Sequence, residues 1–127
     1  ALGPYALQAA IAACHARARA AQETDWPGIA ALYGELAQVA PSPVVELNRA
    51  VAVGMAEGPA AALAIVDRLA GDKALRNYQW LPSVRGDLLA RLGRAAEACG
   101  EFERAAAMAT NARERELMLE RVRSLRG

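Results

Sequence analysis

The 127-residue sequence predicts an all-α fold, and three observations lead to that prediction. Hydrophobic residues make up 54% of the chain, and alanine, the best helix former, is the commonest of them. No segment alternates apolar and polar residues beside a hairpin turn, so we expect no strands. Five of the six prolines stand where a helix can begin, because proline is tolerated in a first turn whose N–H groups have no intrahelical partner.

The prolines and their neighbours divide the chain into seven helices. The five initiating prolines are Pro4, Pro27, Pro43, Pro59 and Pro82. Asp25 and Ser42 can cap the helices that follow them, and Gly58 can turn the chain. We therefore predict helices near residues 4–21, 26–39, 43–56, 59–70, 79–92, 95–109 and 111–125.

The spacing of apolar residues agrees with these boundaries. Ile29, Tyr33 and Leu36 follow one another at i, i+4 and i+7, which places them on one face of a helix. Asn111 followed by Glu114 is a possible capping box for the last helix. That helix has one apolar stripe and an otherwise charged surface, as expected of a capping helix.

The turns inside successive helix pairs recur at a nearly constant interval. They are centred near Thr24, Gly58 and Gly93, which are 34 and 35 residues apart. The third unit is similar to a tetratricopeptide (TPR) repeat at Gly86, Leu89, Gly93, Ala98, Phe102 and Ala105. Asp67 stands in the second unit where the third has its aromatic ring. We predict a TPR-like solenoid of antiparallel helix pairs, about three pairs plus a C-terminal capping helix; a simple antiparallel bundle is the alternative.

The residues do not form a recognisable catalytic or metal-binding pattern. His15 is the only histidine, and its neighbour Cys14 does not supply enough ligands at a suitable spacing. No nucleotide-binding glycine motif and no nucleophile elbow occurs. We therefore expect no enzyme, no cofactor and no metal. Cys14 and Cys99 fall inside predicted helices, and we interpret both as small buried apolar residues in a reducing cytoplasm.

The charge pattern gives no reason to expect nucleic acid or a membrane as a direct partner. The formal net charge is +1, and glutamates are interleaved with the arginines of the last helix. No apolar run is long enough to span a bilayer.

A few polar residues fall where the first helix of each pair would line a groove. Asn48 shares a stripe with Val44, Val51 and Met55, and a polar residue there must be hydrogen-bonded or line a groove. We expect a partner-binding groove with Asn48, Ser83 and Asp87 pointing into it, Arg49 and Arg85 on its flanks, and His15 as a further candidate. The alternative is a partly buried structural network of Asn48, Glu46, Arg49 and Arg85.

Three long blocks and the segment after them carry a further resemblance. The blocks are "GPYALQAAIAACHA" (3–16), "DWPGIAALYGELAQVAPSPVVELNRAVAV" (25–53) and "LPSVRGDLLARLGRAAEACGEFERAA" (81–106), followed by "NARERELMLERV". They resemble the C-terminal TPR-type extension of extracytoplasmic-function (ECF) RNA polymerase sigma factors of the sigma-70 family, of the actinobacterial type whose genes often lie beside those of YCII-related (DGPF) proteins. The resemblance covers almost the whole chain and is weakest over 56–78.

The resemblance implies a role in transcription initiation. Residues 1–127 would form one TPR-like domain of a longer cytoplasmic sigma factor, whose sigma domains 2 and 4 are absent here. The implied partners are its own N-terminal sigma domains and, through the full-length protein, core RNA polymerase, with no direct contact between this fragment and nucleic acid or a membrane. Two alternatives stay open, namely a small-molecule or peptide-sensing helical domain and a structural dimerisation module.

Overall fold

Seven α-helices and one short 3₁₀ helix make up the computed structural model over residues 3–17 and 24–127, the parts of the chain that it describes. They are α1 (Pro4–Arg17), α2 (Trp26–Val39), α3 (Pro43–Glu57), α4 (Pro59–Leu69), η2 (Lys73–Leu75), α5 (Trp80–Arg91), α6 (Ala95–Met108) and α7 (Ala112–Arg126). These ranges contain no strand, so the all-helical prediction is confirmed for them. None of the described helices combines the length and the apolar character that a membrane span requires.

The helix boundaries predicted from the sequence are correct to within one residue at every described end. The exception concerns the first helix, whose predicted residues 18–21 lie outside the described ranges. The short helix η2 was not predicted, because three residues are too few to show a hydrophobic period. Its Asp72 side chain accepts a hydrogen bond from the Ala74 N–H at 2.8 Å, and its Leu75 is buried.

Local chemistry explains where the helices start. Pro43 and Pro59 are first residues of their helices, and Pro82 stands in the first turn of α5. The Asp25 carboxylate caps α2 by accepting from the Gly28 N–H at 3.1 Å. Later in the chain, the turns that follow α3 and α5 use glycines at positive φ, Gly58 at 104° and Gly93 at 79°.

The start of α7 uses half of the predicted capping box. The Asn111 side chain accepts a hydrogen bond from the Glu114 N–H at 2.8 Å. The Glu114 carboxylate accepts one at 2.9 Å from the side-chain amide of Gln79, the residue just before α5. Asn111 therefore caps α7 as predicted, while the Glu114 side chain links α7 to the start of α5.

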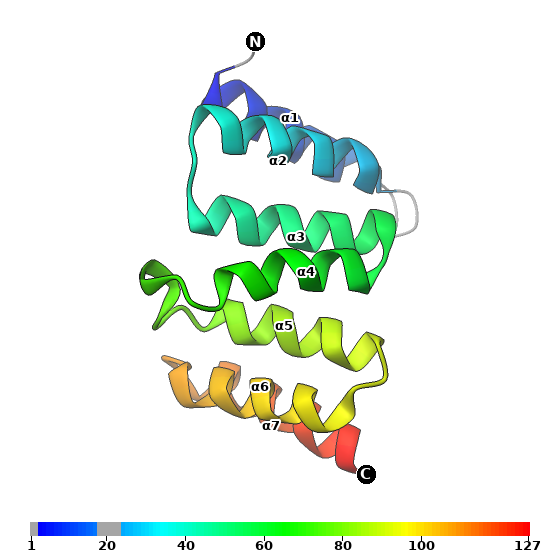
Figure 1. The fold of residues 1–127 in the computed structure, drawn as a ribbon, viewed down its shortest axis with the longest axis vertical. Helices are drawn as coiled ribbons and strands as arrows, with labels where there is room; N and C mark the ends of the chain where they lie inside the picture. Colours follow the sequence, from blue (N-terminus) through cyan, green and yellow to red (C-terminus); the bar gives the residue numbers. More distant parts are fainter. Residues whose placement is uncertain (1–2, 18–23) are drawn as a thin grey trace.

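The helices stack in chain order, each packed mainly against the one before it and the one after it. Figure 1 shows this arrangement, with α1 and α2 at one end of the long axis and α6 and α7 at the other. Non-neighbouring helices touch less, as α3 and α5 do. Alternate helices are therefore placed to line a common face.

The buried core has two parts. The smaller cluster joins α1 and α2 to one side of α3. The larger cluster runs from α3 to α7, and Phe102, fully buried, is its largest side chain. Ala30 packs against both clusters. Cys14 is buried in the smaller cluster and Cys99 in the larger one.

The crossing of α5 and α6 depends on a glycine. A Cβ atom built on Gly86 would lie 2.9 Å from the Cε1 atom of the Phe102 ring, closer than side chains normally approach. The missing side chain lets the ring sit directly on the α5 backbone.

Candidate functional site

Exposed apolar side chains gather on helices α3, α5 and α7. Val44, Val51 and Met55 lie on one stripe of α3, and 46% of the Met55 surface is exposed. Trp80 at the start of α5 is 45% exposed and Leu117 on α7 is 44% exposed. Large apolar residues left open to solvent on adjoining elements are typical of a binding surface. We call this surface the α3–α5–α7 face.

One hollow on this face lies between α3 and α5. Its unfilled space is about 600 Å³, including its open mouth. It is lined by Val51 and Met55 of α3, by Ser83, Val84, Asp87, Leu88 and Arg91 of α5, and by Arg121 of α7. We call it the Val51 hollow. Aliphatic side chains, two guanidinium groups and the Asp87 carboxylate meet in it, so it offers both apolar and charged contacts.

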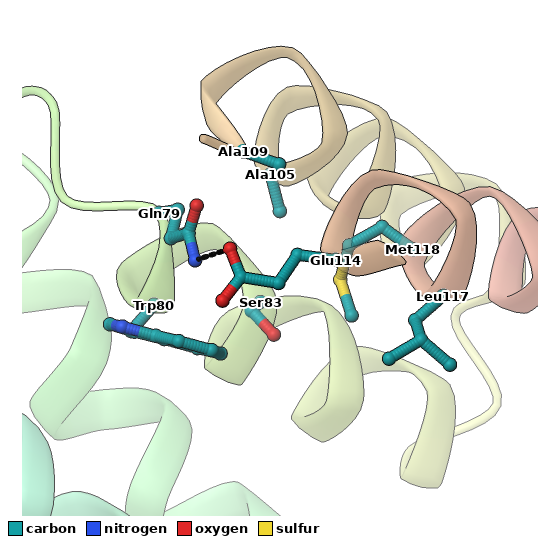
Figure 2. Close-up of a pocket in the computed structure, with 8 residues that line it drawn as sticks. All are labelled: Gln79, Trp80, Ser83, Ala105, Ala109, Glu114, Leu117 and Met118. Carbon is teal, nitrogen blue, oxygen red and sulfur yellow. Dashed lines mark hydrogen bonds between the residues drawn. The ribbon is translucent and has the colours of Figure 1, made fainter. Parts of the chain in front are cut away.

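A second, smaller hollow lies where α5 and α7 meet above α6. Figure 2 shows the Trp80 indole and the Leu117 side chain at its edges, with Met118 and Ala105 between them. We call it the Trp80 pocket, and its unfilled space is about 300 Å³. Ser83 lines both this pocket and the Val51 hollow, so the two are neighbours along α5.

Two side-chain pairs hold α7 against α5. The Arg121 guanidinium donates to the Asp87 carboxylate at 2.9 Å, and it also lies 4.5 Å from the centre of the Phe102 ring. The hydrogen bond from Gln79 to Glu114 closes one end of the Trp80 pocket, as Figure 2 shows. These contacts link α7 to α5 and border the pocket, while α7 packs mainly against α6.

Arg91 connects α5 to α3. It donates to the backbone carbonyl of Gly54 at 3.1 Å. Gly54 stands at a close crossing, since a Cβ atom there would lie 3.1 Å from the Cβ of Ala62. No carboxylate of the described residues lies within 4.0 Å of the Arg91 guanidinium, so Arg91 forms no ion pair among them, although the Asp87 carboxylate lines the same hollow.

The structure brings three of the six predicted groove residues to the α3–α5–α7 face. Ser83 and Asp87 line the Val51 hollow. Asn48 is exposed on the α3 stripe that supplies Val51 and Met55. Within the described ranges no hydrogen bond reaches the Asn48 side chain, which places it outside the structural network considered as the alternative.

Arg85 points elsewhere. It follows Ser83 by two residues, which is about 200° around a helix, so its side chain leaves α5 on the far side from the hollows. There it donates to Asp67 of α4 at 2.9 Å and lies 3.5 Å from Glu101 of α6. The hydrogen bond to Asp67 raises the pKa of the Arg85 guanidinium. Arg85 joins three helices, which fits the structural role that the sequence left open.

Glu101 is the buried carboxylate of this network. Only 6% of its surface is exposed, and Arg104 contacts it at 2.6 Å. The Asp67 carboxylate, which stands where the third unit has its aromatic ring, belongs to the same network through Arg85.

Arg49 and His15 also lie away from the two hollows. Arg49 follows Asn48 by one residue, about 100° around α3, and its guanidinium donates to Glu46 at 2.9 Å. That hydrogen bond lowers the pKa of the Glu46 carboxyl. The His15 ring is exposed and meets the Trp26 ring edge to face, with 5.5 Å between ring centres. Neither residue lines the Val51 hollow or the Trp80 pocket.

Sequence reasoning missed Trp80, Arg91, Leu117 and Arg121. A signal for two of them was available, because Trp80 and Arg91 continue the α5 stripe of Ser83 and Asp87 at helical spacing. Leu117 and Arg121 could not be found in this way, because the packing of α7 in the folded chain decides which of its faces lies toward α5. In the described ranges no three His, Cys, Asp or Glu side chains come together to form a possible metal site.

Comparison with known proteins finds one relative whose function is not stated. An uncharacterized protein of Rhizobium meliloti (strain 1021) is 56% identical over 112 residues. The matched segment covers 88% of this chain and 26% of that protein, so the chain spans about a quarter of the length of the relative. No protein-family model matches the chain. No solved structure matches it either.

Proposed function

We propose that this chain is a regulatory protein–protein interaction domain of an ECF sigma factor, built as a TPR-like array, that acts in transcription initiation by contacting its own sigma region. The single observation that carries the contact role is the α3–α5–α7 face. Exposed apolar side chains and polar groups meet there on alternate helices. In a TPR-like array α3 and α5 would be the first helices of their pairs, which line the inner surface, and α7 would be the capping helix that extends it. The sigma assignment rests on the sequence resemblance.

Such a domain would regulate by favouring one of two states of the longer protein. A domain that docks on the sigma region can shift its activity only by binding one conformation more tightly than the other. A second protein that bound the α3–α5–α7 face would compete with that docking and shift the balance in the opposite direction.

A promoter reporter tests this proposal. The full-length protein and a version that lacks residues 1–127 are compared at matched protein levels, with a promoter that the full-length protein transcribes. We expect transcription to be lost, which would make the domain a required positive element. Increased transcription would make it a fused inhibitor and would still support intramolecular regulation. Unchanged transcription would refute the proposal.

The Trp80 pocket favours a second candidate, the sensing of a small apolar molecule. The pocket is enclosed by Trp80, Met118, Leu117 and Ala105, and apolar hollows with a few polar groups at one end are typical of ligand sites. This candidate predicts that a small apolar compound raises the melting temperature of the chain, and that a Trp80→Ala variant loses the increase. If no compound of a broad apolar set raises the melting temperature of the unmodified chain, this candidate is rejected.

A further inference from the structure

The Trp80 pocket and the Val51 hollow form one trough along α5. Ser83 contributes to both, so they adjoin on α5. Trp80 is the first residue of α5 and Arg91 is the last. The trough therefore follows the whole helix, with an apolar pocket at one end and a guanidinium group at the other.

The apolar end is shaped for one large side chain. Its space of about 300 Å³, which includes its open mouth, has Trp80 and Leu117 at the edges, both nearly half exposed. Met118 lines the interior, and its unbranched thioether can adapt to the shape of an inserted group. An aromatic or leucine side chain placed here would remove the exposed apolar surface of both edge residues from water.

The other end carries the Arg91 guanidinium, which forms no ion pair within 4.0 Å among the described residues. Arg121 is paired with Asp87, whereas Arg91 uses one N–H group to donate to the Gly54 carbonyl and has no carboxylate within 4.0 Å among the described residues. A guanidinium has five N–H groups, so several remain for another acceptor. A carboxylate supplied by an occupant of the trough would meet both the charge and these donors.

We propose that the trough binds a protein segment that inserts one large apolar side chain into the Trp80 pocket and presents a carboxylate to Arg91. This inference deepens the proposed function, on which it rests, by stating the chemistry of the partner. Eight to eleven residues of α5 separate the pocket from Arg91, which corresponds to about 12–16 Å of helix. An extended segment covers that distance in about four or five residues. The two anchors of the partner should have that spacing.

The first experiment selects ligands without assuming the partner. A random dodecapeptide library displayed on phage is panned against the 127-residue chain, and the best peptide is synthesised with a fluorescent label. We expect the selected peptides to share a large apolar residue and an Asp or Glu four or five positions away. Selected peptides without an acidic residue at a constant distance from the apolar one would overturn the inference, as would a failure to select any peptide.

Variants then locate the two contacts by fluorescence anisotropy. Trp80→Ala and Arg91→Gln should each weaken binding of the labelled peptide by about tenfold or more. Arg91→Lys keeps the charge and should recover most of the affinity. Arg76→Gln is the matched control, because Arg76 is an exposed arginine in the segment before α5, outside both hollows. Equal affinity of Arg91→Gln and the unmodified chain would overturn the charge contact.

Two further readouts separate this inference from its rivals. If Arg91 only ties α3 to α5, Arg91→Gln lowers the melting temperature and leaves peptide affinity unchanged, which would overturn the inference. In the promoter reporter, Trp80→Ala and Arg91→Gln are compared with deletion of the domain. If deletion alters transcription and both variants behave as the unmodified protein, the proposed function stands and the trough is not its contact. If deletion has no effect, the proposed function fails, and the peptide measurements decide the inference alone.

Discussion

Replacing Gly86 by alanine tests how closely α5 and α6 cross. The added methyl group would lie 2.9 Å, 3.0 Å and 3.1 Å from three atoms of the Phe102 ring. The ring is completely buried and cannot turn aside into solvent, so the methyl group must displace packed atoms. Overpacking of this kind costs about 1–3 kcal/mol. Alanine gains about 0.5–1 kcal/mol over glycine inside a helix, which leaves a net loss of about 1 kcal/mol at the middle of the two ranges.

Gly100→Ala in α6 is the matched control. A Cβ atom on Gly100 meets nothing within 4 Å, so this variant should show the helix gain alone and become more stable by about 0.5–1 kcal/mol. Urea unfolding of both variants measures the difference, and in thermal melts each kcal/mol should correspond to about 3–5 °C for a chain of this size. Equal stabilisation by the two substitutions would refute the close crossing of α5 and α6.

Three more predictions follow from single residues. Asp25→Ala removes the oxygen that accepts from the Gly28 N–H, so we expect the chain to lose about 1 kcal/mol in urea unfolding, and unchanged stability would show that the cap does not matter. Asn48→Ala should leave the melting temperature unchanged, because the side chain is exposed and receives no hydrogen bond from the described residues; a fall of several degrees would indicate a structural role instead. Arg49 lowers the pKa of Glu46 below its ordinary value of 4.5 in the folded chain, so the stability that this pair adds is present above about pH 4.5 and is lost as the pH falls through the lower folded value. Glu46→Gln should therefore be less stable than the unmodified chain at neutral pH, and the difference should close in acid; a constant difference would contradict the pair.

The helices were predictable because their boundaries depend on local chemistry. Proline lacks the N–H that a first turn leaves unbonded, and Asp25 needs only the next three residues to form its cap. Such signals do not depend on how the rest of the chain folds. The short helix η2 after α4 was missed because its three residues, Lys73–Leu75, are too few to show a hydrophobic period.

The composition of the face was only partly predictable because it depends on how each helix is rotated. Ser83 and Asp87 were assigned to it from their spacing, but Arg85, two residues from each, was also included and instead joins α4, α5 and α6. Arg121 was one of several arginines on a charged helix. Only the packing of α7 on α6 distinguishes it, by placing it beside Asp87 of α5.

The linear stacking of the helices also bears on how the chain reaches its folded state. Each helix packs mainly on its immediate neighbours, and the described side-chain hydrogen bonds span at most 37 residues, the interval from Gly54 to Arg91. Proteins whose contacts are this local close short loops and fold in microseconds to milliseconds. Helices can therefore pair in the order in which the ribosome releases them, and a nascent chain would expose little unpaired apolar surface at any one time.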